Sequence, residues 1–319
     1  MKTIKTILLL SIILSNSISY SQDISKKNYE GMSWRQVGPY RAGWATMSAG
    51  VAGSLNTFYF GSAGGGIWKT TDAGRTWQAL MQHEESSSIG ALAVAPSDSN
   101  IIYAGTGQVA FRYDILSGDG VYRSSDAGST WENIGLKKTC HIGKILVDPK
   151  NSNKIIVAAL GKVFKNSSQR GLYLTSDGGK NWKHVLFVND STGGVDLDAD
   201  PTTPNIIYAS LWQMRMHPWL DYFEPETGKG SGIFKSEDGG EHWTKLNGHG
   251  LPTGNLGRIG LAVANNSNGK IIYATIIAGK GESGLYKSED GGITWKFVNN
   301  NASLANSYFS RITIDPFNP

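Results

Sequence analysis

The eight residues Thr70-Thr71-Asp72-Ala73-Gly74-Arg75-Thr76-Trp77 decide the fold of this chain, because the same signature returns four more times. The later copies occupy residues 124–131, 175–182, 236–243 and 288–295. Every copy has Asp at its third position, Gly at its fifth and Trp at its eighth, and the steps from Trp to Trp are 54, 51, 61 and 52 residues. A near-constant period of this length indicates an array of one supersecondary unit.

Each unit contains four short runs with the composition of strands. In the second unit they are residues 89–96, 101–105, 120–123 and 131–134, and Gly, Pro, Asn and Asp punctuate them. The 40 glycines in 319 residues are about twice the average usage, as frequent turns require. No long stretch after residue 22 has helical periodicity. We therefore predict an all-β chain that folds as a β-propeller of four-stranded blades.

The signature itself is predicted to be the turn between the third and fourth strands of a blade. The Asp side chain accepts hydrogen bonds from nearby backbone N–H groups, and the Gly supplies backbone freedom. The Trp ring then packs between neighbouring blades. We assign structural roles to these Asp and Trp residues in all five copies: Asp72, Trp77, Asp126, Trp131, Asp177, Trp182, Asp238, Trp243, Asp290 and Trp295.

The N-terminus has the pattern of a secretory signal. Lys2 and Lys5 form a basic start, residues 7–14 are apolar, and small residues stand at the end of the segment. The apolar run is too short for a permanent membrane anchor. We predict a signal peptide at 1–21, a polar leader at 22–32 and the propeller at 33–319, in an exported bacterial protein that is periplasmic, on the outer surface or secreted.

Partial repeats stand at both ends of the array. Residues 34–38 are similar to a fourth strand and are expected to close the ring, which removes exposed sheet edges. Residues 311–316 have the pattern of a first strand. We expect five full blades here, within a ring of about seven blades that continues C-terminally in a longer protein; the alternative is a six-bladed ring with an incomplete last blade.

Charge and cysteine content exclude several classes of function. Removal of residues 1–21 leaves 28 basic against 26 acidic residues, with no basic run of the kind that binds nucleic acid. The single Cys140 excludes an intrachain disulfide, and we expect its thiol to be buried. The six histidines show no metal-ligand spacing. We predict no metal, no cofactor and no membrane insertion of the mature chain.

Ligand-binding residues are expected on the face that carries the loops from strand four to strand one and from strand two to strand three, because those loops vary most. The longest of them combine aromatic and charged residues. The candidate ligand-binding residues are Arg41, Trp44, Arg112, Asp114, Asp196, Trp212, Arg215, His217, Trp219 and Arg258. The alternative is that Trp212 and Trp219 only hold a long loop against its own blade.

One strand carries three alternating carboxylates, Asp196, Asp198 and Asp200. A period of two places them on one face, with Asp196 nearest the ligand face and Asp200 in a turn before Pro201. Their role stays open between a general acid, a Ca²⁺ ligand, an ion pair with Arg215 or Arg258, and simple solvation.

The eight-residue repeat resembles the Asp-box, or BNR repeat, of sialidases, xyloglucanases and the sortilin-type receptor domain. The resemblance covers residues 34–319 and implies the propeller fold. The opening, from 34–39 through 64–72, is similar to large exported bacterial proteins described as glycosyl-hydrolase-like or sortilin-N-terminal-like.

The resemblance transfers few functional residues. Xyloglucanases carry a catalytic Asp in a segment of the form Arg-Thr-Asp-Ile-Gly-Gly-Ala-Tyr, and the similar segment here is 61–68, with Ala63 where that Asp would stand. Alanine cannot give or take a proton, so this residue cannot serve as the general acid or base. The Arg-Ile-Pro element of sialidases is absent.

These observations lead us to expect a binding module whose ligand is a glycan or an extracellular protein segment at the mouth of the channel. The first alternative is a glycoside hydrolase that uses Asp114 and Asp196, which would then lie about 5–10 Å apart. The second is an assembly scaffold for other exported proteins, for which we expect a flat channel mouth without a polar hollow.

Overall fold

The computed structural model describes residues 25–32, 43–110, 115–217, 227–247, 249–279, 281–306, 308, 310–316 and 318. The chain divides into two compact units, Met1–Arg41 and Ala42–Pro319. In the first unit the described residues contain one short 3-10 helix, η1 (Lys26–Tyr29). The predicted signal peptide and the predicted closing strand at 34–38 lie outside the described residues.

The second unit consists of five antiparallel sheets of four strands each, and its described residues contain no α-helix. Two further 3-10 turns, η2 (Lys137–Thr139) and η3 (Ala302–Leu304), lie in loops. In chain order the strands are β1 (Ala45–Gly50), β2 (Phe58–Ser62), β3 (Ile67–Thr70), β4 (Gln78–Ala79), β5 (Ile89–Ala95), β6 (Asp98–Thr106), β7 (Val121–Ser124), β8 (Glu132–Gly135), β9 (Ile142–Val147), β10 (Ile155–Ala159), β11 (Gly171–Thr175), β12 (Lys183–Leu186), β13 (Thr192–Ala199), β14 (Ile207–Gln213), β15 (Gly232–Ser236), β16 (Thr244–Lys245), β17 (Leu256–Val263), β18 (Ile272–Ala278), β19 (Gly284–Ser288) and β20 (Lys296–Asn299).

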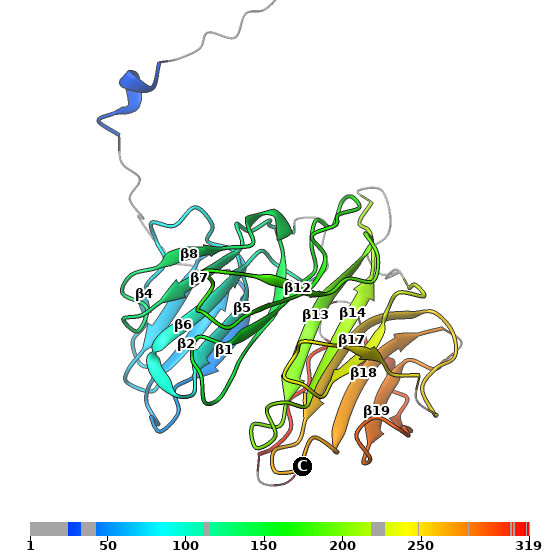
Figure 1. Cartoon of the computed structure of the whole chain (residues 1–319). Helices are drawn as coiled ribbons and strands as arrows, with labels where there is room; N and C mark the ends of the chain where they lie inside the picture. Colours follow the sequence, from blue (N-terminus) through cyan, green and yellow to red (C-terminus); the bar gives the residue numbers. More distant parts are fainter. Residues whose placement is uncertain are drawn as a thin grey trace, which may run out of the picture. The chain divides into compact units, whose positions relative to one another are not determined.

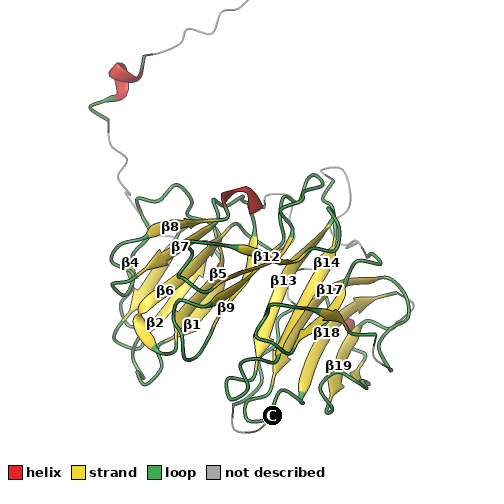
Figure 2. Ribbon diagram, in the orientation of Figure 1, coloured by secondary structure: helices red, strands yellow, loops and turns green. Residues whose placement is uncertain are grey.

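Each sheet is an up-and-down meander, so neighbours in the sheet are neighbours in the sequence. The five sheets stand side by side as blades (Figures 1 and 2). The first strands contact one another in the series β1, β5, β9, β13 and β17, which places them on the inside of the array. The predicted β-propeller of four-stranded blades is confirmed.

The Asp-box forms the predicted turn between the third and fourth strands. Asp72 accepts the backbone N–H of Thr76 at 2.9 Å and the hydroxyl groups of Thr76 and Thr70 at 2.6 and 2.8 Å. These bonds favour the ionised form and lower the pKa of Asp72 to about 2. In the fourth box His242 replaces the Thr, and its Nδ1 lies 2.6 Å from Asp238 Oδ2, so the imidazole has the same turn-closing role.

The boxes share one end of the blades with the turns between first and second strands. The backbone N–H of Ala73 donates to the Asn56 carbonyl at 3.0 Å, and each of the other four boxes makes the equivalent bond. A small apolar cavity at this end, of about 200 Å³, is lined by Pro96, Pro149 and Pro201 together with Gly239 of a box. The opposite end therefore carries the loops that we predicted for the ligand face.

The hydrophobic core lies between blades. One buried cluster joins Tyr103 of the second blade to Ile145 of the third, and comparable clusters join each other pair of adjacent blades. Trp182 extends this packing, since its indole N–H donates to the Ile134 carbonyl of the preceding blade at 2.8 Å. Trp77 belongs to the first blade in the series, and its side chain is 40% exposed.

The segment expected to form a further first strand, 311–316, is not a strand in the structure. First strands hydrogen-bond to the second strand of their own blade, and residues 311–316 belong to none of the five sheets. Residues 310–313 nevertheless run beside β17. At Gly260 the two segments are so close that a Cβ atom there would lie only 2.4 Å from the Ser310 carbonyl oxygen. This close approach puts the segment next to the inner strands.

Candidate functional site

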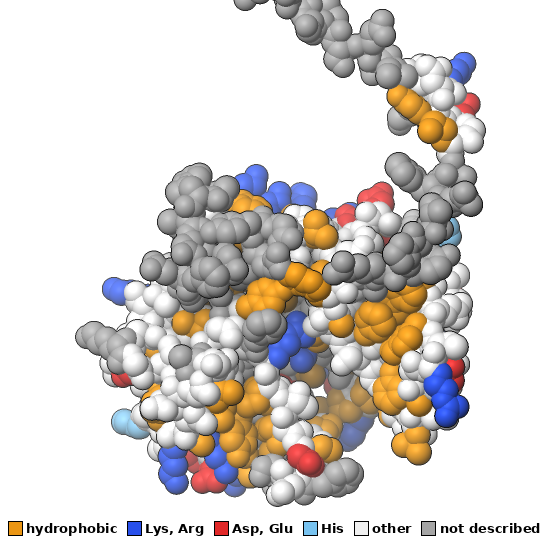
Figure 3. Space-filling model, turned by 180° about the vertical axis from the view of Figure 1, so that it is seen from behind, with side chains coloured by type: hydrophobic (Ala, Val, Ile, Leu, Met, Phe, Trp, Pro, Cys, Tyr) orange, Lys and Arg blue, Asp and Glu red, His pale blue; other side chains and the backbone are white. Residues whose placement is uncertain are grey.

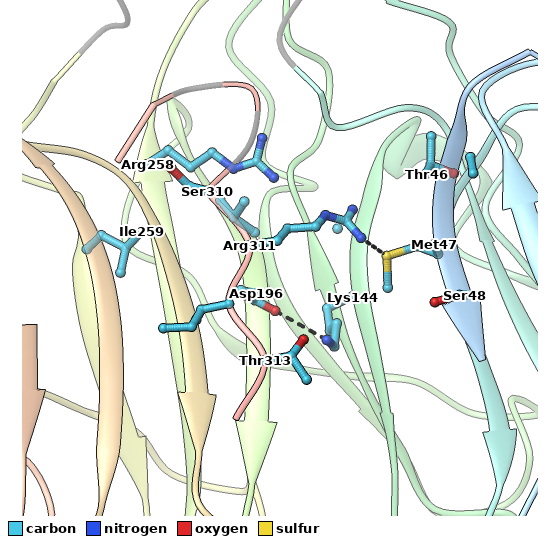
Figure 4. Close-up of a pocket in the computed structure, with 14 residues that line it drawn as sticks. Thr46, Met47, Ser48, Lys144, Asp196, Arg258, Ile259, Ser310, Arg311 and Thr313 are labelled. Atoms are coloured by element: carbon cyan, nitrogen blue, oxygen red, sulfur yellow. Dashed lines mark hydrogen bonds and ion pairs between the residues drawn. The ribbon is translucent and has the colours of Figure 1, made fainter. Parts of the chain in front are cut away.

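A central cavity of about 340 Å³ lies between the inner strands (Figure 4). Strands β1, β9, β13 and β17 supply its walls, and residues 310–313 complete them. The lining side chains that carry charge or hydrogen-bonding groups are Thr46, Ser48, Lys144, Asp196, Arg258, Ser310, Arg311 and Thr313. The cavity is a polar hollow, unlike the flat channel mouth expected of an assembly scaffold.

Asp196 is the central carboxylate of this cavity. Its Oδ1 lies 3.6 Å from the Lys144 ammonium, and its Oδ2 accepts the backbone N–H of Leu261 at 3.0 Å. Of the alternatives left open for Asp196, an ion pair is therefore present with Lys144 as its partner, and the charge of Asp196 also acts on Arg258. Lys144 reaches Asp196 because it lies on β9, the inner strand of the neighbouring blade, which contacts β13.

The alternating carboxylates of β13 and that of Asp200 just after it do share one face, as predicted. Asp198 accepts the N–H of Val263 at 2.8 Å, and Asp200 accepts the N–H of Gly269 at 3.3 Å. Together with Asp196 they connect the fourth blade to the fifth by side-chain to main-chain bonds. Asp200 also accepts the N–H and hydroxyl of Thr202, which confirms it as a turn residue. Burial raises the pKa of Asp198 to about 6, with Asp196 adding a smaller effect in the same direction.

Two arginines extend into the cavity from different segments. Arg258 on β17 is 3% exposed, and its Nη1 donates to the Val109 carbonyl at 3.1 Å. Arg311 reaches across toward β1 and contacts the Met47 sulfur (Figure 4). Burial lowers the pKa of Arg258 to about 10, and the charge of Arg311 adds to this effect. The two guanidinium groups are thus close enough to repel each other.

A space-filling view shows Lys and Arg side chains within a hollow at the middle of the face drawn (Figure 3). Among the described lining residues of the cavity, three cations face one carboxylate. The arrangement does not resemble an acid–base pair, because the Asp196 carboxylate is shared between Lys144 and a backbone amide.

Trp212, a predicted ligand-binding residue, is fully buried, so its ring has no surface for a ligand. It belongs to an apolar cluster with Val109, Leu160 and Val163. These neighbours come from loops of the second and third blades. The loops at this end of the blades therefore pack on one another. The alternative that Trp212 only holds a loop against its own blade is incomplete, because Trp212 also contacts loops of two other blades.

The other predicted residues are distributed unevenly. Trp44 is exposed directly before β1, and its ring meets Tyr308 edge-on with centroids 5.7 Å apart. Arg215 is exposed and His217 is half-buried. The remaining four lie outside the described residues: Arg41, Arg112, Asp114 and Trp219.

Ala63 lies in the loop between β2 and β3, and its N–H donates to the Trp44 carbonyl at 2.9 Å. The position equivalent by resemblance to a catalytic Asp is therefore on the face where we predicted ligand binding, and the side chain there is a methyl group. Cys140 is half-buried, where we had expected a buried thiol.

Within the part of the chain that the structure describes, no three His, Cys, Asp or Glu side chains are placed to hold a metal ion. A search of the same residues finds no helix long and apolar enough to cross a membrane.

Sequence reasoning missed Lys144 and Arg311 as members of the site. We looked for ligand contacts in long loops, whereas these two side chains come from the inner strand β9 and from the segment beside β17. A signal was available, because first strands line the axis of a propeller and a charge within one of them must face either the axis or a neighbouring blade.

Comparison with known proteins agrees with the fold. The family model described as "Sortilin, neurotensin receptor 3" (Sortilin-Vps10) matches residues 65–210 and 119–273, which together exceed half of the chain. A xyloglucanase of Paenibacillus sp is 27% identical over 265 residues, covering 72% of this chain and 23% of that protein. A xyloglucanase of Acetivibrio thermocellus is 28% identical over 253 residues, covering 73% and 28%.

Solved structures show the same architecture. The GH74 xyloglucanase of Xanthomonas campestris superposes with a TM-score of 0.64 at 17% identity, covering 86% of this chain and 42% of that one. An ancestral GH74 enzyme gives a TM-score of 0.65 at 21% identity, covering 90% and 35%. The chain spans less than a third of the length of these two curated relatives. With five Asp-box blades and a family model that matches most of them, this chain belongs to the Sortilin-Vps10 family.

Proposed function

We propose that this chain is part of an exported, glycoside-hydrolase-type propeller that acts on a branched glucan of the xyloglucan kind. One observation carries the proposal: xyloglucanases match 72–73% of the chain at 27–28% identity. The exposed Trp44 ring beside the polar cavity gives local support, because an aromatic face next to hydrogen-bonding groups suits a sugar ring.

At least one catalytic carboxylate must differ from that of the xyloglucanases, because Ala63 stands at the position of their catalytic Asp and has no ionisable group. Asp196 is a poor replacement, since Lys144 and the Leu261 amide already hold its carboxylate. Asp114 is the remaining candidate from the sequence, and we assign it the role of general acid or base in this proposal.

A second candidate function is a glycan-binding module without catalysis. The methyl group of Ala63 on the ligand face favours it, because the fold is kept while one proton-transferring group is missing. In both cases the ligand class is a glycan, and the two functions differ in whether a glycosidic bond is broken.

The experiment is to incubate the full chain with xyloglucan, to measure new reducing ends, and to measure retention in a xyloglucan-containing native gel. A hydrolase releases reducing ends, and Asp114→Asn abolishes the release while the surface control Asp98→Asn does not. Retention in the gel without release would support the binding module. Neither retention nor release would overturn both functions.

A further inference from the structure

The charged groups of the central cavity already interact within the protein. Lys144 lies 3.6 Å from Asp196, whose charge also acts on Arg258 and Arg311. Arg258 in addition donates to a backbone carbonyl. A ligand of this hollow therefore need not carry a charge, and hydrogen-bonding groups are what the cavity offers to it.

Two hydroxyl groups in the cavity are not used by the fold. Ser48 on β1 and Thr313 beside β17 are exposed lining residues, and neither hydroxyl has a hydrogen-bond partner among the described residues. The Lys144 ammonium has three N–H groups, so its ion pair with Asp196 leaves donors available. These side chains surround the same hollow (Figure 4). A sugar hydroxyl both donates and accepts hydrogen bonds, as this set of groups requires.

The cavity lies toward one end of the propeller axis. Its lining residues 45–48, 143–144, 195–196 and 258–259 stand in the first part or the middle of the inner strands, before the turns at the Asp-box end. It shares no lining residue with the apolar cavity at the Asp-box end, so the two hollows are separate. A branch of a polymer can enter such a hollow by its free end, whereas the main chain would also have to leave it.

Aromatic side chains stand next to the lining residues of the cavity. Trp44 directly precedes the lining residue Ala45, and Tyr308 comes two positions before the lining residue Ser310. The two rings meet edge-on with centroids 5.7 Å apart, and Trp44 is 39% exposed. An exposed aromatic ring beside hydrogen-bonding groups suits the face of a glucose ring, so the main chain of a glucan has a support at the rim.

We propose that the central cavity binds a neutral branch sugar of the glucan, while the main chain stays at the rim beside Trp44. The inference rests on the proposed function for the ligand being a branched glucan, and it adds which part of that glucan the cavity recognises. The volume of about 340 Å³ is near the lower limit of small-ligand sites, which suits a short branch. The hydroxyl groups of Ser48 and Thr313 and the Lys144 ammonium then bond to the hydroxyl groups of the branch.

The test is isothermal titration of the full chain with xyloglucan heptasaccharide and with cellotetraose, which has the same main chain without the branches. We expect the branched sugar to bind roughly 10- to 100-fold more tightly, as a few additional neutral hydrogen bonds imply. Rising ionic strength should leave both affinities unchanged, because neither sugar is charged. Trigalacturonate is titrated in parallel as an acidic probe.

Two variants of the lining residues test the cavity itself. Ser48→Phe fills the hollow with an aromatic ring and should reduce the affinity for the heptasaccharide to that for cellotetraose. Thr313→Val removes one hydroxyl group and keeps the shape of the side chain, in a segment that belongs to none of the five sheets. We expect it to weaken heptasaccharide binding roughly three- to tenfold without changing cellotetraose binding.

The matched control is Thr71→Val, which alters an exposed threonine of the first Asp-box at the opposite end of the blades and should bind both sugars as the parent does. Thermal melts verify that each variant is folded. If Ser48→Phe does not fold, Thr313→Val decides the test, because its side chain is exposed and has the same shape as the parent's.

Every other outcome overturns the inference. Equal binding of heptasaccharide and cellotetraose shows that the branches are not recognised, and an unaffected Thr313→Val variant shows that the cavity does not hold them. Trigalacturonate that binds more tightly than the heptasaccharide assigns the cavity to acidic ligands. Hydrolysis or gel retention of xyloglucan without a preference for the branched oligosaccharide leaves the proposed function intact. Absence of binding to every probe overturns the inference, whereas the hydrolysis and gel experiment still decides the proposed function.

Discussion

The carboxylate of Asp198 gives a pH-dependent stability that can be worked out from the structure. Asp198 accepts the Val263 N–H at 2.8 Å across the boundary between the fourth and fifth blades, and burial raises its pKa from 3.8 to about 6. A shift of about two pH units corresponds to about 3 kcal/mol. Because the side chain keeps partial exposure to solvent, we expect about 2–3 kcal/mol.

The sign of the effect follows from linkage. The folded protein binds this proton more tightly than the unfolded chain, so the contribution of Asp198 to the unfolding free energy falls as the pH rises from about 4 to about 6. Above pH 6 the cost of the buried charge is present in full. In Asp198→Asn the side chain is neutral at every pH, and its carbonyl oxygen can still accept the Val263 N–H.

The assay is urea unfolding followed by tryptophan fluorescence, for the parent and Asp198→Asn, at intervals between pH 4 and pH 8. The quantity of interest is the difference in unfolding free energy between the two proteins. Only the change of this difference with pH is used, and its constant part is ignored. We expect the variant to gain about 2–3 kcal/mol on the parent between pH 4 and pH 7. The exposed carboxylate variant Asp98→Asn reports the general effect of removing a surface charge. A difference between parent and Asp198→Asn that stays constant with pH would refute the reasoning.

Three further predictions concern buried groups. Trp212→Ala should cost about 3–5 kcal/mol in urea unfolding, since the indole is fully buried; a loss below about 1 kcal/mol would mean that the loop cluster does not stabilise the fold. Tyr208→Phe removes a hydroxyl that donates to the carbonyls of Gly269 and Gly291 at 2.8 and 3.1 Å, and should cost about 1–2 kcal/mol, with unchanged stability as the contrary result. Burial lowers the pKa of His141 to about 4, so its contribution to the unfolding free energy should be present above pH 6.5 and lost as the pH falls toward 4. The unfolding free energy of His141→Gln should lack this dependence on pH. The same pH profile in the parent and in His141→Gln would contradict the assignment.

The sequence alone determined the blade architecture, because its determinants are local and repeated. An Asp such as Asp72 closes a turn through bonds to residues no more than four positions away, so the motif carries its own geometry wherever it occurs. The alternation of Asp196, Asp198 and Asp200 likewise predicted one shared face, since a strand has a period of two.

Tertiary structure decided which side chains meet around the axis. The partner of Asp196 is Lys144, 52 positions earlier in the sequence, and the Arg311 side chain reaches Met47 on β1; both contacts depend on how the blades turn about the axis, which no local pattern records. The burial of Trp212 was equally hidden, because the loops that cover it belong to two other blades. Short-range hydrogen bonds can be foreseen from spacing, whereas charge and burial at the axis result from packing among distant segments.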